Sequence, residues 1–360
     1  MIKVGSDFSG VGAFNQALIR LDIEYKELFA CDMDKYARQT FIHNYGEPEY
    51  YPTNVYDRQI PSESLDIYMT SPPCQAFSLA GKRLGKDDKR GILFFNSHEF
   101  IQKNKPRYFI FENVKGLLSD DGGNTFQEWI NMLGGKSVNG VPVIFPYEDS
   151  VHYHLYWQVL NAKHHGVPQN RERVFLIGIR DDSDNNFQFP REEHLSKRLK
   201  DVLEDDVDDK YFLSEQLLSY FADHKKIHKE RGNGFKFEPH TDKTIVSNAI
   251  SRKCGSRQTD PFIQIGDYRK DEGFRWRQDG NSPAIMAMMR DTWKEKFTGQ
   301  NPPIINKDYK IRRLTPRECF RLMDFPDTFT WPVSDSQAYK QAGNSIVVNV
   351  LYKIIKNLKL

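Results

Sequence analysis

A single thiol stands on a stiff stretch of chain after an apolar run. The segment DIYMTSPPCQAFS places Cys74 directly after Pro72 and Pro73. The two prolines fix their φ angles and lack amide donors, so this stretch predicts a rigid loop and not a helix interior or a central strand. A buried structural thiol is the commoner state of a free cysteine. A rigid loop nonetheless suits a nucleophilic thiolate, whose direction of attack must be held and whose pKa must be lowered.

Charged residues at two other apolar runs could complete such a site. Glu112 and Asn113 end the run RYFIFENV, where desolvation would raise the pKa of the Glu112 carboxyl and suit it to hold or donate a proton. Arg171 and Arg173, in QNRERVF, stand two apart and so on one side of an extended segment. Two cations near a thiol would stabilise its thiolate or bind a phosphate. Taken singly, these residues are explained equally well as solvated strand ends.

A glycine-rich turn points to a nucleotide-like ligand. In DFSGVGAF, Gly10 and Gly12 follow an apolar run and could let the backbone approach such a ligand, although a lone GxG is usually structural. Asp32 ends the next apolar run, where a carboxylate can accept hydrogen bonds from both ribose hydroxyls. Together these residues favour an adenosine-containing cofactor. They leave open whether it is a nicotinamide dinucleotide or S-adenosylmethionine.

The elements that would position these residues alternate along the first part of the chain. Apolar runs predict strands at 1–8, 26–32, 65–71, 107–114, 154–160 and 173–179. Helical spacing predicts helices directly after the glycine turn and at 34–46, 92–103 and 124–133. Strands that alternate with helices predict βαβ units and a mostly parallel sheet covered on both faces. In such sheets the chemistry lies beyond the carboxyl ends of the strands.

The rest of the chain divides into an irregular part and an ordered one. From about 181 to 305 the alternation fades, and we interpret this region as a second, smaller domain with long loops. RLTPRECFRLMDFP then places Thr315, Pro316 and Glu318 at the Ncap, N1 and N3 positions of a helix, a capping-box pattern. An apolar stripe over 346–358 predicts a last helix that docks back on the first domain.

Composition sets further bounds. A chain of 360 residues is long enough for two domains. Its four cysteines lie far apart, with no CxxC pair and no histidine cluster at metal-ligand spacing, so we expect neither a disulfide framework nor a zinc site. Because no apolar run approaches the roughly 18 residues of a membrane span and no signal-peptide pattern is present, we expect a cytoplasmic protein. The net charge of +2 is too mild to indicate a nucleic-acid partner.

The motifs together resemble those of the DNA (cytosine-5) methyltransferase family, of the bacterial or phage modification type. DFSGVGAF resembles its cofactor loop, SPPCQAFS its nucleophile loop and ENV its acid motif. QNRERVF resembles its paired-arginine motif, RLTPRECFRLMDFP the helix after its target-recognition domain, and QAGNSIVVNVL its closing motif. The six motifs come in the family's order, and that combination is highly specific although ENV or GxG alone would mean little.

The resemblance implies an α/β fold with two domains. Residues 1–180 and 312–360 would form a Rossmann-like S-adenosylmethionine-dependent methyltransferase domain, and 181–311 a smaller, irregular target-recognition domain. The implied substrate is double-stranded DNA and the implied methyl donor is S-adenosylmethionine, with no metal and no membrane. We expect a monomer that associates with the nucleoid through DNA. A restriction endonuclease acting on the same site is a candidate partner.

The resemblance also implies covalent catalysis on a cytosine flipped out of the duplex. The Cys74 thiolate would add to carbon 6 and make carbon 5 an enamine nucleophile, and loss of the carbon 5 proton and of the thiol would follow methyl transfer. Glu112 would contact ring nitrogen 3 and the exocyclic amine. Arg173 would orient Glu112 or bind the carbonyl oxygen of the base, and Arg171 would support the nucleophile or a nearby phosphate.

Motif matching also assigns residues to the cofactor and to DNA. The cofactor set is Phe8, Ser9, Gly10, Gly12, Asp32, Met33, Asn54, Pro73, Asn344 and Ser345. Phe8 would stack near adenine, Asp32 is shorter than the usual glutamate at the ribose, and Asn54 stands where an acidic residue is usual. The DNA set comes from a basic flap after Cys74 and from the middle domain, and comprises Gln75, Ser78, Lys82, Arg83, Arg257, Arg275 and Arg277.

Three alternatives remain open. A tRNA cytosine methyltransferase on the same scaffold would keep Cys74 and Glu112 and act on an RNA loop. A non-catalytic, nucleic-acid-binding relic of the fold would not need the intact set of cysteine, glutamate and two arginines. A nicotinamide oxidoreductase would use the glycine turn and Asp32, and it leaves the other motifs unexplained.

Overall fold

The computed structural model describes most of the catalytic motifs and part of the middle region. The described residues are 1–73, 92–214, 216–221, 237–241, 243–254, 260–265, 268–269, 273–274 and 310–360. Cys74 lies outside them. So do all the expected DNA-contacting residues, which are Gln75, Ser78, Lys82, Arg83, Arg257, Arg275 and Arg277.

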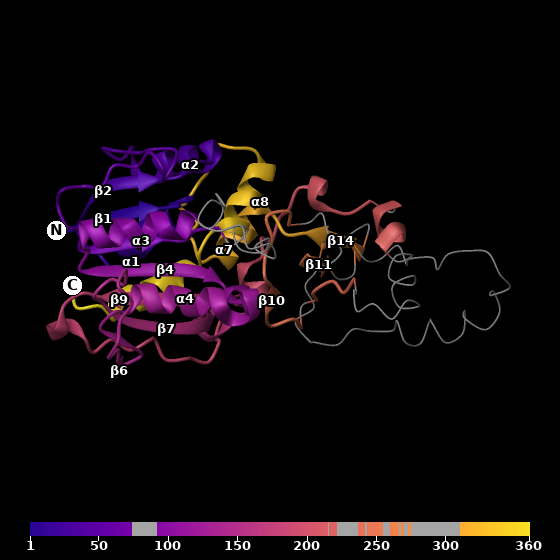
Figure 1. Cartoon of the computed structure of the whole chain (residues 1–360). Helices are drawn as coiled ribbons and strands as arrows, with labels where there is room; N and C mark the ends of the chain where they lie inside the picture. The colour runs from indigo at the N-terminus through magenta and orange to yellow at the C-terminus, as the bar shows by residue number, and fades with distance from the viewer. Residues whose placement is uncertain are drawn as a thin grey trace.

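A central sheet with strand order β2-β1-β3-β4-β9-β7-β5-β6 forms the larger lobe (Figure 1). Its strands are β1 (Ile2–Asp7), β2 (Tyr25–Cys31), β3 (Ile67–Thr70), β4 (Tyr108–Val114), β5 (Ser137–Val138), β6 (Val141–Pro142), β7 (His154–Asn161) and β9 (Glu172–Ile179). β2, β1, β3 and β4 are parallel, whereas β9 runs antiparallel to both β4 and β7. The six predicted strands are confirmed. The parallel part of the sheet carries the glycine turn and also Pro72 and Pro73, which we call the Cys74 stalk.

Helices cover both faces of this sheet because its strands are apolar on both sides. The helices are α1 (Ala13–Arg20), α2 (Lys35–Tyr45), α3 (Ile92–Asn104), α4 (Asn124–Leu133), α7 (Pro316–Leu322), α8 (Asp335–Asn344) and α9 (Val348–Lys356). In β4, Tyr108 and Ile110 join the cluster that includes α1 and α9, whereas Phe109 and Phe111 join the cluster that includes α3 and α4. Successive strand residues point to opposite faces, so a nearly unbroken apolar run is what a doubly covered strand requires.

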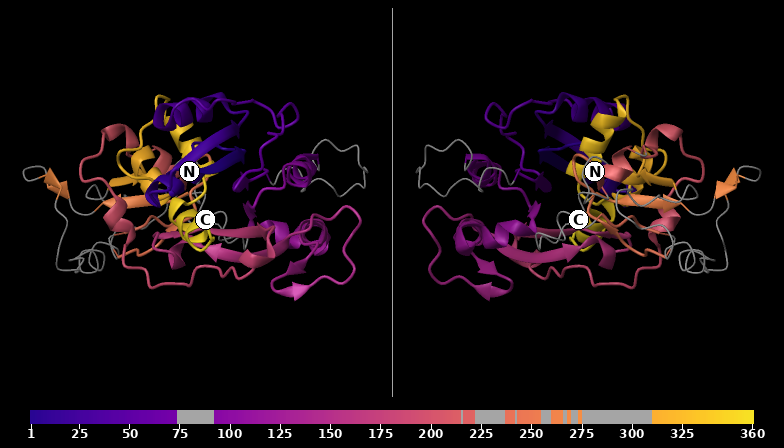
Figure 2. Two further views of the ribbon diagram at one scale, coloured as in Figure 1. Left: turned by 90° about the vertical axis from the view of Figure 1, so that its left-hand side faces the viewer. Right: turned by 90° about the vertical axis from the view of Figure 1, so that its right-hand side faces the viewer.

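Short elements complete the described fold. The 3-10 turns are η2 (Lys115–Gly123), η3 (Ala162–His164), η4 (Asp182–Asp184), η5 (Leu199–Val202) and η6 (Asp209–Tyr211). Three small ladders pair β10 (Ser247–Asn248) with β8 (Gln169–Asn170), β11 (Phe262–Ile265) with β14 (Lys310–Arg313), and β12 (Tyr268–Arg269) with β13 (Gly273–Phe274). β11 and β14 lie beyond α7 and α8, away from the two chain ends, which are side by side in Figures 1 and 2.

The larger lobe and the middle region share one apolar cluster. Phe187, Leu199, Val202, Ile250 and Ile263 are all buried in the cluster that also contains α1 and α9. β14, at the expected boundary near 312, pairs with β11 of the middle region. The division into 1–180 with 312–360 and 181–311 stays a prediction, and the two parts are joined by a continuous core.

The capping box predicted for the helix after the middle region is confirmed, and it has a partner that the sequence did not reveal. Thr315 caps α7 and receives the amide of Glu318, while the Glu318 carboxylate accepts the Thr315 amide at 2.8 Å. Glu318 also binds the guanidinium of Arg312 through two contacts of 2.7 Å, with both side chains almost fully buried. This bidentate ion pair joins β14 to α7.

Two of the four cysteines meet in the fold although they lie far apart in the sequence. The sulfur of Cys319, on α7, is 3.8 Å from the sulfur of Cys254, and both side chains are buried. The contact joins the segment after β10 to α7. Sequence spacing did not suggest it because the two residues belong to different parts of the chain.

The buried pair of Arg312 and Glu318 predicts a strong dependence of stability on Arg312. Replacing Arg312 by Met leaves an uncompensated carboxylate in the core and should lower the free energy of unfolding by about 3–5 kcal/mol. Arg313→Met is the matched control, because Arg313 is the next residue in the same strand and is only partly buried. Urea denaturation followed by circular dichroism measures both. Equal losses in the two variants would contradict the stabilising role of the pair.

Candidate active site

Several elements bring their ends to one edge of the sheet. β1, β3 and β4 are parallel neighbours, with Asp7 opposite Thr70 and Thr70 opposite Phe111, so their carboxyl ends coincide. β9 runs the other way, with Arg173 opposite Val114. Because an antiparallel strand begins where its parallel neighbours end, Arg173 is placed at the same edge as the glycine turn and the Cys74 stalk.

Glu112 and Arg173 form an ion pair at this edge. Arg173 Nε lies 3.0 Å from Glu112 Oε1, and the glutamate is 8% exposed. Burial raises the pKa of the Glu112 carboxyl, while the charges of Arg173 and Arg171 oppose that rise. The raised pKa of the Glu112 carboxyl eases uptake of a proton, which suits a group that stabilises a changing charge.

The stalk of Cys74 is anchored to the strand that carries Glu112. The Asn113 side-chain amide donates to the carbonyl of Pro72 at 3.2 Å, and both residues are buried. Pro73 is exposed and is the last residue described before Cys74. The chain thus reaches Cys74 from a point that is bound to β4. The sequence places Asn113 at the end of an apolar run, and the structure shows that its side chain binds the segment before Cys74.

Arg171 makes its side-chain hydrogen bonds to the main chain and not to Glu112. Its guanidinium donates to three backbone carbonyls, those of Ile250, Gly343 and Ser345, at 3.3, 3.1 and 2.8 Å. The side chain is 4% exposed. The charge of Arg171 still acts on the Glu112 carboxyl and opposes the rise of its pKa.

The glycine turn leaves open space in front of the sheet edge. Phe8, Gly10 and Gly12 have φ angles of 58°, 56° and 84°, in the left-handed region that favours glycine. A Cβ on Gly12 would lie 2.2 Å from the ring of Tyr45, so that position needs a glycine. A Cβ on Gly10 would meet nothing within 4 Å. The turn therefore presents bare backbone to a space that a ligand can enter.

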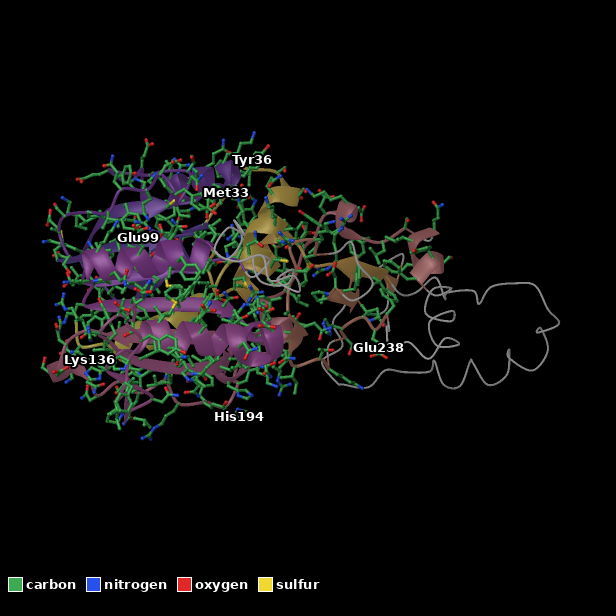
Figure 3. The ribbon with its side chains drawn as sticks, viewed as in Figure 1. Met33, Tyr36, Glu99, Lys136, His194 and Glu238 are labelled. Carbon is green, nitrogen blue, oxygen red and sulfur yellow. The ribbon has the colours of Figure 1, made fainter. Side chains whose placement is uncertain are left out.

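Asp32 connects the second strand to this turn. Its Oδ2 accepts the amide of Gly10 at 2.8 Å, and its Oδ1 accepts the amide of Asp34 at 2.8 Å. Burial raises its pKa, and these two amides oppose the rise. Met33 follows with an 85% exposed side chain, and Figure 3 places it beside Tyr36 on the side of the lobe nearest α8. A carboxylate and an exposed apolar side chain are thus adjacent.

The two remaining cofactor segments differ in what they present. Asn54 is exposed, and its side chain already accepts the amide of Tyr56 at 3.1 Å. Asn344 is exposed at the end of α8, whereas Ser345 is buried. α8 is held to the start of α2 by the ion pair of Lys340 with Asp34 at 2.6 Å. That contact holds α8, of which Asn344 is the last residue, to the segment that follows Asp32.

These features fit an adenosine-bearing cofactor. Gly10 leaves room for a ligand against the backbone, Asp32 supplies carboxylate oxygens of the kind that bind ribose, and Met33 supplies an exposed apolar surface. The partly buried Phe8 and the hydroxyl of Ser9, 3.3 Å from that of Tyr51, border the same turn. Among the described residues no group of three or more His, Cys, Asp or Glu side chains could hold a metal ion.

A buried ionic cluster under the glycine turn was missed by sequence reasoning. Asp7 is 1% exposed, forms an ion pair with Arg58 Nε at 2.9 Å and accepts the hydroxyl of Tyr68 at 2.5 Å. Arg58 also lies over the ring of Phe100, 4.5 Å from its centroid. The aspartate in DFSG was the only available signal, because nothing in the sequence linked it to Arg58.

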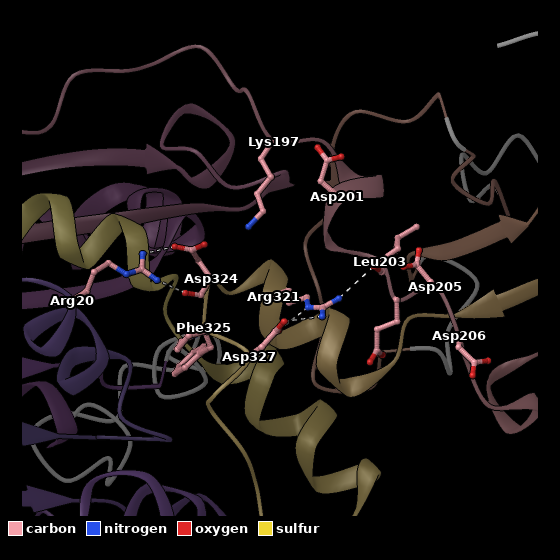
Figure 4. Close-up of a pocket in the computed structure, with 12 residues that line it drawn as sticks. Arg20, Lys197, Asp201, Leu203, Asp205, Asp206, Arg321, Asp324, Phe325 and Asp327 are labelled. Atoms are coloured by element: carbon pink, nitrogen blue, oxygen red, sulfur yellow. Dashed lines mark hydrogen bonds and ion pairs between the residues drawn. The ribbon is translucent and has the colours of Figure 1, made fainter. Parts of the chain in front are cut away.

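A cavity of about 660 Å³ lies elsewhere and has none of the expected site residues in its lining. Arg20, Lys197, Asp201, Glu204, Arg321 and Asp327 are among the residues that line it (Figure 4). Two of its cations are already paired, Arg20 with Asp324 and Arg321 with Asp327. This polar cavity is separate from the sheet edge.

In the described part of the chain, no helix combines the length and the apolar character needed to cross a membrane.

The ion pair at the sheet edge predicts how Glu112 titrates. Arg173→Met removes the charge that most opposes the effect of burial, so the pKa of Glu112 should rise further above its ordinary value. Carbon-13 NMR of carboxyl-labelled glutamate measures the titration, with Glu112→Gln to assign the signal. Arg180→Met, whose charge pairs with Asp181, is the control and should leave that titration in place. An unchanged or lower pKa in Arg173→Met would contradict the arrangement.

Comparisons with known proteins agree with this geometry. The sequence model of the family C-5 cytosine-specific DNA methylase matches residues 2–360. Type II methyltransferase M.HpaII of Haemophilus parainfluenzae is 34% identical over 95% of this chain and 84% of its own length. Type II methyltransferase M1.ScrFI of Lactococcus lactis subsp. cremoris is 32% identical over 98% of this chain and 76% of its own length.

A phage relative and a solved structure extend the comparison. Orphan methyltransferase M.SPRI of Bacillus phage SPR is 31% identical over 99% of this chain and 97% of its own length. The crystal structure of S. pombe Dnmt2 methyltransferase shares the fold, with a TM-score of 0.67, 19% identity and coverage of 99% of this chain and 97% of that one. The chain therefore belongs to the family of C-5 cytosine-specific DNA methylases, enzymes that transfer a methyl group from S-adenosylmethionine to carbon 5 of cytosine in DNA.

Proposed function

We propose that this protein methylates a cytosine, flipped out of duplex DNA at a specific sequence, through a covalent bond to Cys74. The observation that carries the proposal is the pairing of Glu112 with Arg173 at 3.0 Å, on the strand to which the Cys74 stalk is tied through Asn113 and Pro72. A nucleophile, a desolvated carboxyl and a guanidinium would then face one base.

The chemistry begins with addition of the Cys74 thiolate to carbon 6 of the cytosine, which breaks the double bond between carbons 5 and 6. Glu112, with its raised pKa, would place a proton at ring nitrogen 3 as electron density arrives there. Because Arg173 contacts Oε1 of Glu112, we assign the other oxygen to the base. Carbon 5 then becomes the nucleophile of an enamine.

When bound, S-adenosylmethionine supplies an electrophilic methyl group. Asp32 would hold the ribose hydroxyls, Phe8 and Met33 would border the adenine, and the backbone at Gly10 and Gly12 would lie along the methionine part. Ser9, Asn54, Pro73, Asn344 and Ser345 complete the proposed contacts. After methyl transfer the carbon 5 proton leaves to water or hydroxide, and the Cys74 sulfur departs with the electron pair of its bond to carbon 6.

We assign sequence choice and DNA contact to polar and basic residues of the segment after Cys74 and of the middle region. Gln75, Ser78, Lys82, Arg83, Arg257, Arg275 and Arg277 are proposed to contact DNA, where cations on phosphates give salt-dependent affinity. We also propose that the protein acts as a monomer associated with the nucleoid, and that a restriction endonuclease of the same specificity accompanies it. Resistance of the modified DNA to such an endonuclease would support that pairing.

The covalent mechanism predicts the behaviour of Cys74 variants. Purified protein should transfer a labelled methyl group from S-adenosylmethionine to duplex DNA, and Cys74→Ser should abolish transfer because a hydroxyl is a far weaker nucleophile than a thiolate. Duplex DNA with 5-fluorocytosine at the target should trap the wild type as a covalent complex, since fluorine cannot leave as a cation. Bisulfite sequencing of DNA from expressing cells identifies the target.

Cys31→Ala is the control for this experiment. Burial raises the pKa of Cys31 to about 12, so its thiol is inert and its loss should leave methyl transfer intact. Methylation by Cys74→Ser at the wild-type rate would rule out the covalent mechanism. Labelling of tRNA in place of DNA would assign the scaffold to the RNA alternative.

The ribose contact predicts weaker cofactor binding in Asp32→Asn. An amide loses the charge that strengthens hydrogen bonds to hydroxyls, so the dissociation constant of S-adenosylmethionine should rise about tenfold. Asp22→Asn is the matched control, since Asp22 is exposed and its φ of 56° is tolerated by asparagine. Calorimetry measures both, and a 2′,3′-dideoxyribose analogue, which lacks both hydroxyls, should bind the two variants with similar affinity. Unchanged binding by Asp32→Asn would remove Asp32 from the cofactor site.

A further inference from the structure

Arg171 lies where three segments of the chain meet. Its Nη2 donates to the carbonyls of Gly343 and Ser345 at 3.1 and 2.8 Å, and its Nη1 donates to the carbonyl of Ile250 at 3.3 Å. The side chain is 4% exposed, and its Nε has no hydrogen-bond partner among the described residues. The guanidinium is thus enclosed by main-chain oxygens from α8 and from the segment after β10.

These acceptors are the groups that a helix leaves unsatisfied. α8 ends at Asn344, and the last carbonyls of a helix have no amide within the helix to accept from. They also carry the negative end of the helix dipole, which a cation stabilises. Burial, and then the neighbouring charge of Arg173, lower the pKa of Arg171 to about 9. The positive charge is therefore used inside the protein, where a DNA phosphate would find no exposed guanidinium.

Further contacts near Arg171 anchor the segment after β10, in the middle region of the chain. Ile250 also donates its amide to the side chain of Gln169 at 3.3 Å, and Gln169 donates to the carbonyl of Leu322, the last residue of α7, at 2.6 Å. A Cβ on Gly343 would lie 2.5 Å from the carbonyl carbon of Ser251. The segment is therefore seated against the end of α8 with no room for a side chain between them.

We propose that Arg171 is a positioning residue that caps the C-terminal end of α8 and fixes Asn344 against the segment after β10, which belongs to the expected target-recognition domain. Three carbonyls from two segments need the fork of a guanidinium, which a single ammonium cannot replace. This role differs from support of the nucleophile or of a phosphate. The inference rests on the proposed function, in which Asn344 contacts the cofactor.

The test compares Arg171→Lys with Asn344→Ala and with the double variant. Lysine keeps the charge near Glu112, so a loss of activity reports the lost carbonyl contacts. We expect kcat to fall by roughly 10²-fold, as for a misplaced reacting group. The double variant should be no slower than the slower single variant, because both changes act through one side chain.

DNA affinity separates positioning from phosphate contact. The dissociation constant of a labelled duplex carrying the target site is measured over a range of salt concentrations for wild type, Arg171→Met and Arg83→Met, two changes that each remove a charge. The slope of log affinity against log salt should stay at its wild-type value in Arg171→Met. Loss of one phosphate contact would make the slope shallower by about 0.9, and Arg83→Met is expected to show that change.

Two further variants keep the test decisive. Arg20→Lys is the control, since Arg20 also binds a carboxylate and a carbonyl, both of Asp324, and lies outside the site, so activity and slope should stay unchanged. Gly343→Ala puts a methyl group between the end of α8 and Ser251, and so pushes these two segments apart while leaving Arg171 in place. It should reproduce the loss of kcat, and it substitutes for Arg171→Lys if that variant does not fold.

Three results would overturn the inference. A shallower salt slope in Arg171→Met would make Arg171 a phosphate contact. Additive losses in the double variant would show that Arg171 does not act through Asn344. Wild-type kcat in Asn344→Ala would remove the group that Arg171 is proposed to position, and the trapping experiment with 5-fluorocytosine would still decide the role of Cys74 independently.

Discussion

The ion pair between Glu112 and Arg173 depends on a reversal of strand direction. A carboxyl at the end of an apolar strand loses hydration, and it stays functional only if a cation reaches the same place. A parallel neighbour would bring its own carboxyl end there. β9 instead runs antiparallel beside β4, so its first residues bring a guanidinium to the edge where β1, β3 and β4 finish. Parallel pairing brings the turn and the stalk together, and this one antiparallel contact adds Arg173 beside them.

Buried guanidinium groups recur at the joints of the molecule. Arg58 joins the segment after α2 to β1 through Asp7, Arg171 joins the turn between β8 and β9 to α8, and Arg312 joins β14 to α7 through Glu318. Apolar contacts tolerate small shifts between elements, whereas a buried guanidinium is stabilised only when its acceptors are correctly placed. These three side chains therefore suit joints whose relative position the chemistry requires.

Local patterns in the sequence predicted the strands, the helices and the capping box of α7, because each depends on residues within a few positions of one another. The edge that carries Glu112 also followed, since the order of apolar runs implies which strand ends meet. Contacts between distant segments did not follow. Arg58 with Asp7, Cys254 with Cys319 and the turn of Arg171 toward α8 depend on how lobes pack, and no local pattern encodes that. α8 itself was missed because its sequence is mostly polar.

The pairing of the first and last helices has a consequence for biosynthesis. α9 packs on α1, and Arg20 donates to Asn349, 329 residues further along the chain. While the ribosome is making the middle region, the apolar side of α1 has no α9 to cover it. Closing so long a loop is slow, and such surface is prone to association. The nascent chain thus keeps its first lobe incomplete until α9 has been made and has folded onto α1.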